Sequence, residues 1–236
     1  MYFFRLIFAV VFLAGLFATT NAQVCAFPDK PWKCCNASSI DGCPVEGCGG
    51  DSNLNVRKNI TEIPDANDVE DWTFNDMLNV TFPAQWSSGQ DRSLLTTWGE
   101  GNAIRIKARL KKVVNYSSGK ESTNCNLKRN ENNDFHLVLT RVKNKPESQS
   151  ITAEITPRMR PDGWTLNKLR KLALDQYYVR VTGYLMLDTQ HIGDDHPVRY
   201  THWEIHPVTA FEVCILTKTA CDNGDGWEDL ADWPEP

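Results

Sequence analysis

Alternating hydrophobic and polar positions dominate the second half of the chain. Side chains two residues apart share one face of a β-strand, so a two-residue period predicts a strand with one buried face. The second half contains five strand-like runs, separated by polar connections. The predicted strands span residues 102–114, 134–140, 151–156, 179–187 and 202–213.

One segment between the third and fourth runs has a helical period instead. Residues 164–175 carry apolar side chains three and four positions apart, which predicts an amphipathic helix. Asp162 or Thr165 would cap its start. Three strands, a helix and two strands follow the order of a five-stranded OB-fold barrel. We therefore predict a mainly β protein, an OB-like barrel with one helix between strands 3 and 4.

The flanking segments show no lasting period. Residues 23–100 are rich in Cys, Gly, Pro and Asn. They predict a Cys-rich, loop-rich segment with one short helix near residues 71–78 and no catalytic signature. The barrel domain is expected to span residues 101–216. Residues 217–236 form an acidic C-terminal tail, of which we expect residues 222–236 to be exposed.

The first 22 residues predict a secretory signal peptide. Arg5 supplies a positive charge, residues 6–17 are apolar, and small residues precede a cleavage site near Ala22. The apolar run is short for a membrane span, and no later segment is apolar enough to cross a bilayer. We expect a secreted protein, extracellular or periplasmic.

Charge and cysteine content fit an exported globular protein. The chain of 236 residues has 25 basic and 30 acidic side chains, and removal of Arg5 would leave a net charge near −6. Binding to a polyanion would therefore need a local basic patch. All eight cysteines follow the cleavage site, and an even number in an exported chain indicates disulfides, whose pairing stays open. A zinc knot is the alternative, but the five N-terminal cysteines do not form paired C-x2-C motifs.

Carboxylate and imidazole side chains recur on or beside the predicted strands. Strands of a small barrel are near neighbours, so these side chains could converge on a divalent metal such as Zn or Mn. The alternative is a structural network of hydrogen-bonded Asp–His and Glu–His pairs. The predicted metal ligands are His136, His191, His206 and Glu204. Asp134, Asp188 and Glu154 would orient the imidazoles, and in a catalytic version Glu204 or Glu154 would activate metal-bound water.

A second candidate feature is a stripe of basic side chains on the outer face of the first predicted strand. OB barrels bind oligonucleotides or oligosaccharides across one face and its neighbouring loops, and alternating cations could follow a phosphate or sulfate backbone. The alternative interpretation is an ordinary solvated strand face. The predicted polyanion-binding residues are Arg105, Lys107, Arg109 and Arg158.

Several segments resemble a family of secreted bacterial proteins with an OB-like fold. The similar motifs are GCPVEGCGGD, NDFHLVL, ITAEITPRMRP, VRVTGYLMLD and WEIHPV, and the similarity covers about residues 40–214. The resemblance implies the fold and export, and it implies no activity. Two functions stay open: a binding module with a His/carboxylate metal site, or a metal-dependent hydrolase of the nuclease or phosphodiesterase type. We favour the binding module because the hydrolase motifs G-x-S-x-G and H-E-x-x-H are missing from the sequence.

Overall fold

The computed structural model describes residues 36–192 and 198–234. The predicted signal peptide and three of the cysteines (Cys25, Cys34 and Cys35) lie outside these residues, as does His196 in the connection before the last barrel strand. Within the described ranges, no helix is both long and apolar enough to cross a bilayer.

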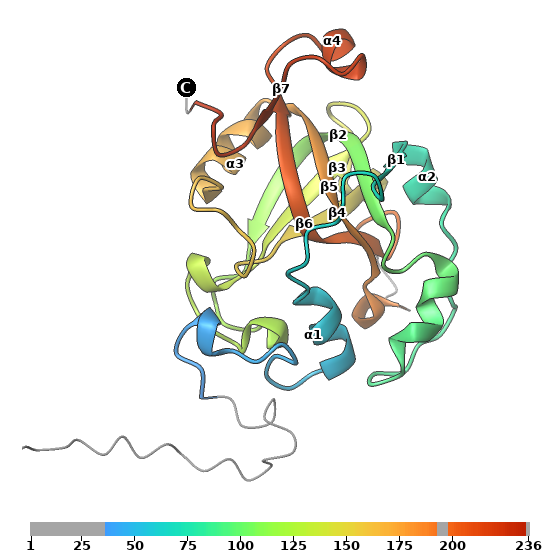
Figure 1. Cartoon of the computed structure of the whole chain (residues 1–236), viewed down its shortest axis with the longest axis vertical. Coiled ribbons are helices and arrows are strands. Elements are labelled where there is room, and N and C mark those ends of the chain that lie inside the picture. Colours follow the sequence, from blue (N-terminus) through green and yellow to red (C-terminus); the bar gives the residue numbers. More distant parts are fainter. Residues whose placement is uncertain (1–35, 193–197, 235–236) are drawn as a thin grey trace, which may run out of the picture.

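Five strands close into a barrel in the order β2-β3-β4-β6-β5, and β5 pairs with β2 to complete it (Figure 1). β4 and β6 are parallel, and the other barrel pairs are antiparallel. Helix α3 lies between the third and fourth barrel strands along the chain, which confirms the predicted OB-like fold. These elements are β2 (Ala103–Asn115), β3 (Phe135–Thr140), β4 (Ser150–Ile155), α3 (Leu166–Leu174), β5 (Tyr178–Leu187) and β6 (Trp203–Cys214).

The barrel interior is filled by the alternating apolar positions of its strands. In β3, for example, Phe135, Leu137 and Leu139 are buried in the main core, while His136 lies on the outer face. α3 adds its leucine stripe to the same core. Thr165 caps this helix by accepting a hydrogen bond from the Lys168 amide, as the sequence predicts.

Short elements outside the barrel extend or cover it. β1 pairs in parallel with β2, and β7 pairs antiparallel with β6. These elements are α1 (Ser52–Lys58), β1 (Glu70–Trp72), α2 (Phe74–Asn79), α4 (Lys218–Asp222) and β7 (Trp227–Asp229), and the 3-10 helices are η2 (Ile40–Gly42), η3 (Arg92–Trp98), η4 (Ser122–Asn124), η5 (Asn130–Asn132), η6 (Glu147–Gln149) and η7 (Thr189–His191).

The acidic C-terminal segment packs against the barrel, so the expectation that it is exposed is wrong. Leu230 is fully buried, Trp233 is 5% exposed, and both belong to the main core. The Leu230 amide donates to the Phe211 carbonyl, and the Cys214–Cys221 disulfide ties α4 to the end of β6. Burial of these apolar side chains stabilises the segment even though acidic residues surround them in sequence.

The N-terminal segment folds back over one side of the barrel. Asp51 caps the start of α1, and its side chain accepts hydrogen bonds from the amides of Asn53 and Leu54 in the first turn. The Cys43–Cys125 disulfide joins this segment to the loop between β2 and β3. Figure 1 shows α1 on one side of the barrel and α3 on the other. Cys43 is disulfide-bonded, so it cannot serve as a ligand in the zinc knot considered above. For this residue, the prediction that the cysteines form disulfides is confirmed.

Asn59, directly after α1, fixes the helix to the loops beneath it. Its side chain is buried, and its Nδ2 donates to the carbonyls of Val45 (2.8 Å) and Thr123 (3.0 Å). Its Oδ1 accepts from Arg158 Nε at 2.8 Å. The end of α1 is thereby held in place over the outer faces of β3, β4 and β6.

Candidate metal centre

Three neighbouring strands bring the candidate side chains into one row on the outer face of the barrel. His136 on β3 lies opposite Glu154 on β4 in the antiparallel pairing. Thr152 lies opposite Glu204 in the parallel pairing of β4 with β6, so the side chains two residues further along each strand are neighbours as well. Those side chains are Glu154 and His206. The fold therefore places one histidine on each side of Glu154.

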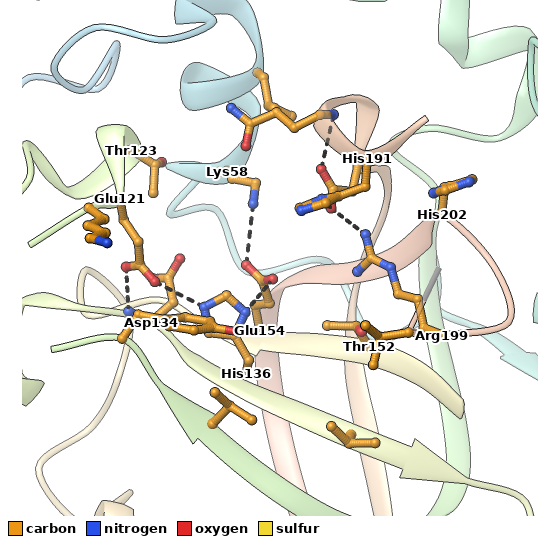
Figure 2. Close-up of a pocket in the computed structure, with 18 of the residues that line it drawn as sticks. Lys58, Glu121, Thr123, Asp134, His136, Thr152, Glu154, His191, Arg199 and His202 are labelled. Carbon is orange, nitrogen blue, oxygen red and sulfur yellow. Dashed lines mark hydrogen bonds and ion pairs between the residues drawn. The ribbon is translucent and has the colours of Figure 1, made fainter. Parts of the chain in front are cut away.

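Glu154 contacts a different imidazole with each of its carboxylate oxygens. Oε1 lies 2.8 Å from Nδ1 of His136, and Oε2 lies 2.7 Å from Nδ1 of His206. His136 also donates from Nε2 to Glu121 Oε1 at 3.0 Å, so both of its nitrogens face carboxylates (Figure 2). His136 is thus bound between two acids in the manner of an imidazolium.

Asp134, Glu154 and His206 form a group that could hold a metal ion. One ligand atom from each lies within 4.8 Å of the others, and all three residues are buried. The Nε2 atom of His206 is 3.8 Å from Asp134 Oδ2. Neither ring nitrogen of His206 has a hydrogen bond of good geometry; its 2.7 Å contact with Glu154 is close but poorly directed. Its imidazole would bind a metal ion only after losing its proton, so metal binding and protonation compete at this ring.

A second set of charges continues the network towards the loop between β5 and β6. Glu204 Oε2 accepts from Arg199 Nη1 at 2.7 Å, and the other guanidinium nitrogen of Arg199 binds Asp188. Asp188 Oδ2 also contacts His191 Nδ1 at 2.5 Å. Glu204 Oε1 lies 3.5 Å from His206 Nδ1 and joins this set to the metal group. The three predicted histidine ligands are therefore linked through one chain of contacts, although His191 lies at its far, exposed end.

α1 contributes a lysine to the centre of the network. Lys58 Nζ lies 3.4 Å from Glu154 Oε2 and 3.6 Å from Glu204 Oε1. Figure 2 shows its side chain descending from α1 towards Glu154. The side chain is 12% exposed, so the ammonium is largely withdrawn from water and bound by carboxylates.

Burial and mutual charge shift the pKa of several groups. Burial would lower the pKa of His206, but the charge of Glu154 outweighs it and raises that pKa to about 9. The pKa of His136 is raised well above its ordinary value, because Glu154 and Glu121 outweigh burial. Burial raises the pKa of Asp134 to about 6, helped by repulsion from Glu121. For Glu154 the effect of burial is overcome by the charges of His136 and Lys58, and the pKa is lowered well below its ordinary value. Near neutral pH, the metal-free protein therefore holds protonated imidazoles against an ionised Glu154.

A cavity of about 610 Å³ opens beside the metal group. Its floor is the outer face of β3 and β4, and its walls are α1 and the loops that precede β3 and β6. OB folds bind their ligands on the same face, between the same two loops. Asp134, His136 and Glu154 line the cavity, as do Lys58 and Arg199. A ligand bound there would lie next to the metal group.

The residues at metal-binding distance in the structure are only partly those predicted as metal ligands from the sequence. Asp134 and Glu154, expected to orient imidazoles, lie in the group at metal-binding distance, together with His206. His136 has both nitrogens against carboxylates, and His191 contacts Asp188 instead. The predicted roles of His136 and His191 as ligands, of Glu204 as ligand or base, and of Glu154 as base remain predictions.

The basic stripe is bound within the protein and lies away from this cavity. Arg105 forms two hydrogen bonds with Asp71 on β1, at 2.6 and 2.8 Å. The other three predicted polyanion-binding residues donate to backbone carbonyls: Lys107 to Asp222, Arg109 to Gln176, and Arg158, which follows β4, to Cys43 and Pro44. None of the four lines the cavity. A polyanion site on this stripe remains a prediction, and the observed contacts are structural.

Sequence reasoning missed three members of the network: Lys58, Glu121 and Arg199. Glu121 and Arg199 lie in polar connections without periodicity, and Lys58 lies in a segment in which we predicted no helix. A signal for α1 is present, because Asp51 precedes the apolar Leu54 at capping distance. The position of that helix over the barrel has no local signal.

Comparison with known proteins adds little to this description. No protein-family model matches the chain, and no curated protein matches it. Among solved structures, the chain is similar to the aspartyl tRNA synthetase from Entamoeba histolytica, with 14% identity and a TM-score of 0.27. The match covers 66% of this chain and 27% of the synthetase, so this chain corresponds to about a quarter of that enzyme's length. A likeness of this extent carries no functional argument.

Proposed function

We propose that this protein is a secreted, disulfide-stabilised OB-fold binding module that holds one divalent metal ion between Asp134, Glu154 and His206. The observation that carries the proposal is the convergence of these three buried ligands from β4, β6 and the residue before β3, with their ligand atoms within 4.8 Å. The ion would form the inner end of the cavity, where it could polarise an oxygen atom of a bound ligand.

The chemistry of the ligands favours zinc or manganese. One imidazole nitrogen with two carboxylate oxygens suits borderline divalent metals, whereas calcium prefers an all-oxygen environment. Glu121 lies near the group and hydrogen-bonds the Asp134 amide at 3.2 Å, so it supports the position of one ligand.

Export is supported by the predicted signal peptide and by the resemblance to secreted bacterial proteins. The Cys43–Cys125 and Cys214–Cys221 disulfides point the same way, because such bonds form in oxidising compartments.

Elemental analysis of the purified mature protein tests the proposal. The protein should be prepared without added metal and without a metal-binding affinity tag. We expect about one zinc or manganese ion per chain, and loss of that ion from the Asp134→Asn and His206→Asn variants. His191→Asn is the matched control and should keep the ion. A folded wild-type protein that contains no metal and takes up none on dialysis against zinc or manganese would contradict the proposal.

The cavity beside the metal group supports a second candidate, a metal-dependent hydrolase acting on an extracellular polyanion such as a nucleic acid. Glu204 would then serve as the base, because Glu154 is engaged as a ligand. Oε1 is the oxygen that would act, since Oε2 binds Arg199 and Oε1 has only the longer contacts with Lys58 and His206. The test is hydrolysis of a single-stranded oligonucleotide by the zinc- or manganese-loaded protein. Activity that is lost in Glu204→Gln, with the metal retained, would favour the hydrolase over the binding module.

A further inference from the structure

Lys58 lies where a second cation would bind. Its ammonium group contacts Glu154 Oε2 and Glu204 Oε1, and the same two oxygens lie 2.7 and 3.5 Å from Nδ1 of His206. Asp134 approaches the same ring from its other nitrogen, Nε2. The imidazole of His206 therefore has carboxylates beside both of its ring nitrogens. Lys58 contacts the two carboxylates that lie on the Nδ1 side.

The charges around this ring explain why a fixed cation is needed. Glu154, Glu204, Asp134 and Asp188 are all at most 4% exposed. Arg199 pairs with Asp188 and with Oε2 of Glu204, which leaves Oε1 of Glu204 and Oε2 of Glu154 to His206 and Lys58. Buried carboxylates without a counter-ion are strongly destabilising. Lys58 supplies the missing charge from outside the barrel, because α1 brings it in over β4 and β6.

The attachment of α1 makes this cation a permanent part of the site. The Cys43–Cys125 disulfide and the hydrogen bonds of Asn59 hold the segment on both sides of the helix. A lysine from a freely moving loop would exchange with dissolved cations, whereas this one is kept at a high local concentration.

We propose that Lys58 is a built-in counter-ion that fills a second cation position between Glu154 and Glu204 and thereby limits the site to one divalent ion. This inference extends the proposed metal site. It also predicts that removal of the ammonium group converts the network into a site for two ions, bridged by Glu154. Bridging carboxylates of this kind are common where two divalent metals share a site.

Zinc titration of the metal-free full-length mature protein tests the inference. We compare the wild type with Lys58→Met, which keeps the length of the side chain and removes its charge. The wild type should bind one zinc ion, and Lys58→Met should bind two. Lys112→Met is the matched control: Lys112 also lines the cavity, but it pairs with Glu147 at its edge and should leave the stoichiometry at one.

The possible results separate this inference from the proposed function. One ion in both proteins at equal affinity supports the metal site and overturns the role of Lys58. No ion in the wild type and one in Lys58→Met supports Lys58 as the resident cation and overturns the proposed metal function. No ion in either folded protein overturns both.

A second pair of variants covers the case in which Lys58→Met does not fold. Glu204→Gln keeps the lysine, and the double variant Lys58→Met/Glu204→Gln removes one positive and one negative charge together. Without the repulsion from Lys58, the double variant should bind zinc at least fivefold more tightly than Glu204→Gln. Equal affinity in these two proteins would overturn the inference.

Discussion

The Oε2 atom of Glu154 lies 2.7 Å from Nδ1 of His206, and the parallel pairing of β4 with β6 is what brings these two residues together. This parallel pair is part of the barrel, so the contact is fixed by the topology and does not depend on loop conformation. It joins the acidic groups near β3 to those near the loop before β6. Disturbing it should therefore affect both metal binding and stability.

Replacement of His206 by alanine should abolish metal binding and destabilise the metal-free protein. The substitution removes one proposed ligand and leaves Glu154 and Glu204 with one cationic partner fewer in a buried environment. We expect a loss of roughly 3 kcal/mol in the free energy of unfolding. Chemical denaturation in the presence of a chelator measures this. His191→Ala should lower the same free energy by less than about 1 kcal/mol, because the ring is 58% exposed and Asp188 keeps Arg199 as a partner.

The stability of the metal-free protein should fall as the pH rises from 6.5 towards 9. The pKa of His206 is about 9 in the folded state against an ordinary value of 6.5, so the folded state binds the proton more tightly. Its contribution is complete below pH 6.5 and is lost as the pH rises through 9; for a shift of this size it amounts to roughly 3 kcal/mol. His136 acts in the same direction.

Thermal melts in a chelating buffer at several pH values measure this dependence. The decrease should be reduced in a His136→Gln variant, which lacks one of the two titrating imidazoles. A melting temperature that rises between pH 6.5 and 9 in the wild type would contradict the protonation states inferred for the network.

Replacement of Arg199 by alanine should be strongly destabilising. Arg199 is 14% exposed and binds both Asp188 and Glu204, which are almost fully buried. Removing one partner of a buried ion pair typically costs about 3–5 kcal/mol, because the remaining charge has no water to solvate it. Lys112→Ala provides the comparison: this lysine is half-exposed and pairs with Glu147, so its loss should cost less than about 1 kcal/mol. Similar losses for both variants, measured by urea denaturation, would show that the Arg199 network is hydrated.

The Cys43–Cys125 and Cys214–Cys221 disulfides should contribute unequally to stability. Cys43 and Cys125 are separated by 82 positions, whereas Cys214 and Cys221 are separated by 7. Loop-closure entropy predicts stabilisation of roughly 4–5 kcal/mol for the long loop and roughly 2–3 kcal/mol for the short one. Paired Cys→Ala substitutions at each bridge, followed by denaturation in guanidinium chloride, compare the two. A larger loss at Cys214–Cys221 would show that entropy of the unfolded chain does not determine the difference.

The barrel could be predicted because the pattern of apolar residues that specifies each of its elements lies within one short segment of the sequence. Two-residue periodicity defines each strand, and the helical stripe between residues 164 and 175 fixes the order of elements. The same periodicity placed Glu204 and His206 on one face, and the barrel made their convergence with Asp134 and Glu154 a reasonable expectation.

The rest of the site depends on contacts that have no local pattern. Lys58 reaches the network only because α1 crosses the barrel, and this path is determined by the Cys43–Cys125 bridge and by Asn59. The partners of the basic stripe also come from distant segments, such as Asp71 on β1 and the carbonyl of Asp222 in α4. The contacts of Arg105 and Lys107 with these distant segments have no signal in the alternating pattern of β2, and polyanion binding by the stripe stays a prediction.

The burial of Asn59 also bears on the choice of expression host. Asn59, Ile60 and Thr61 form a sequon for N-linked glycosylation, and the Nδ2 atom that would carry the sugar is the atom that donates to Val45 and Thr123. A glycan added before folding would occupy the space between α1 and the loops, and the helix could not close over β4 and β6. A bacterial host without this modification avoids the problem, and so does a Thr61→Ala variant in a eukaryotic host, because it removes the sequon and keeps the Asn59 amide in place.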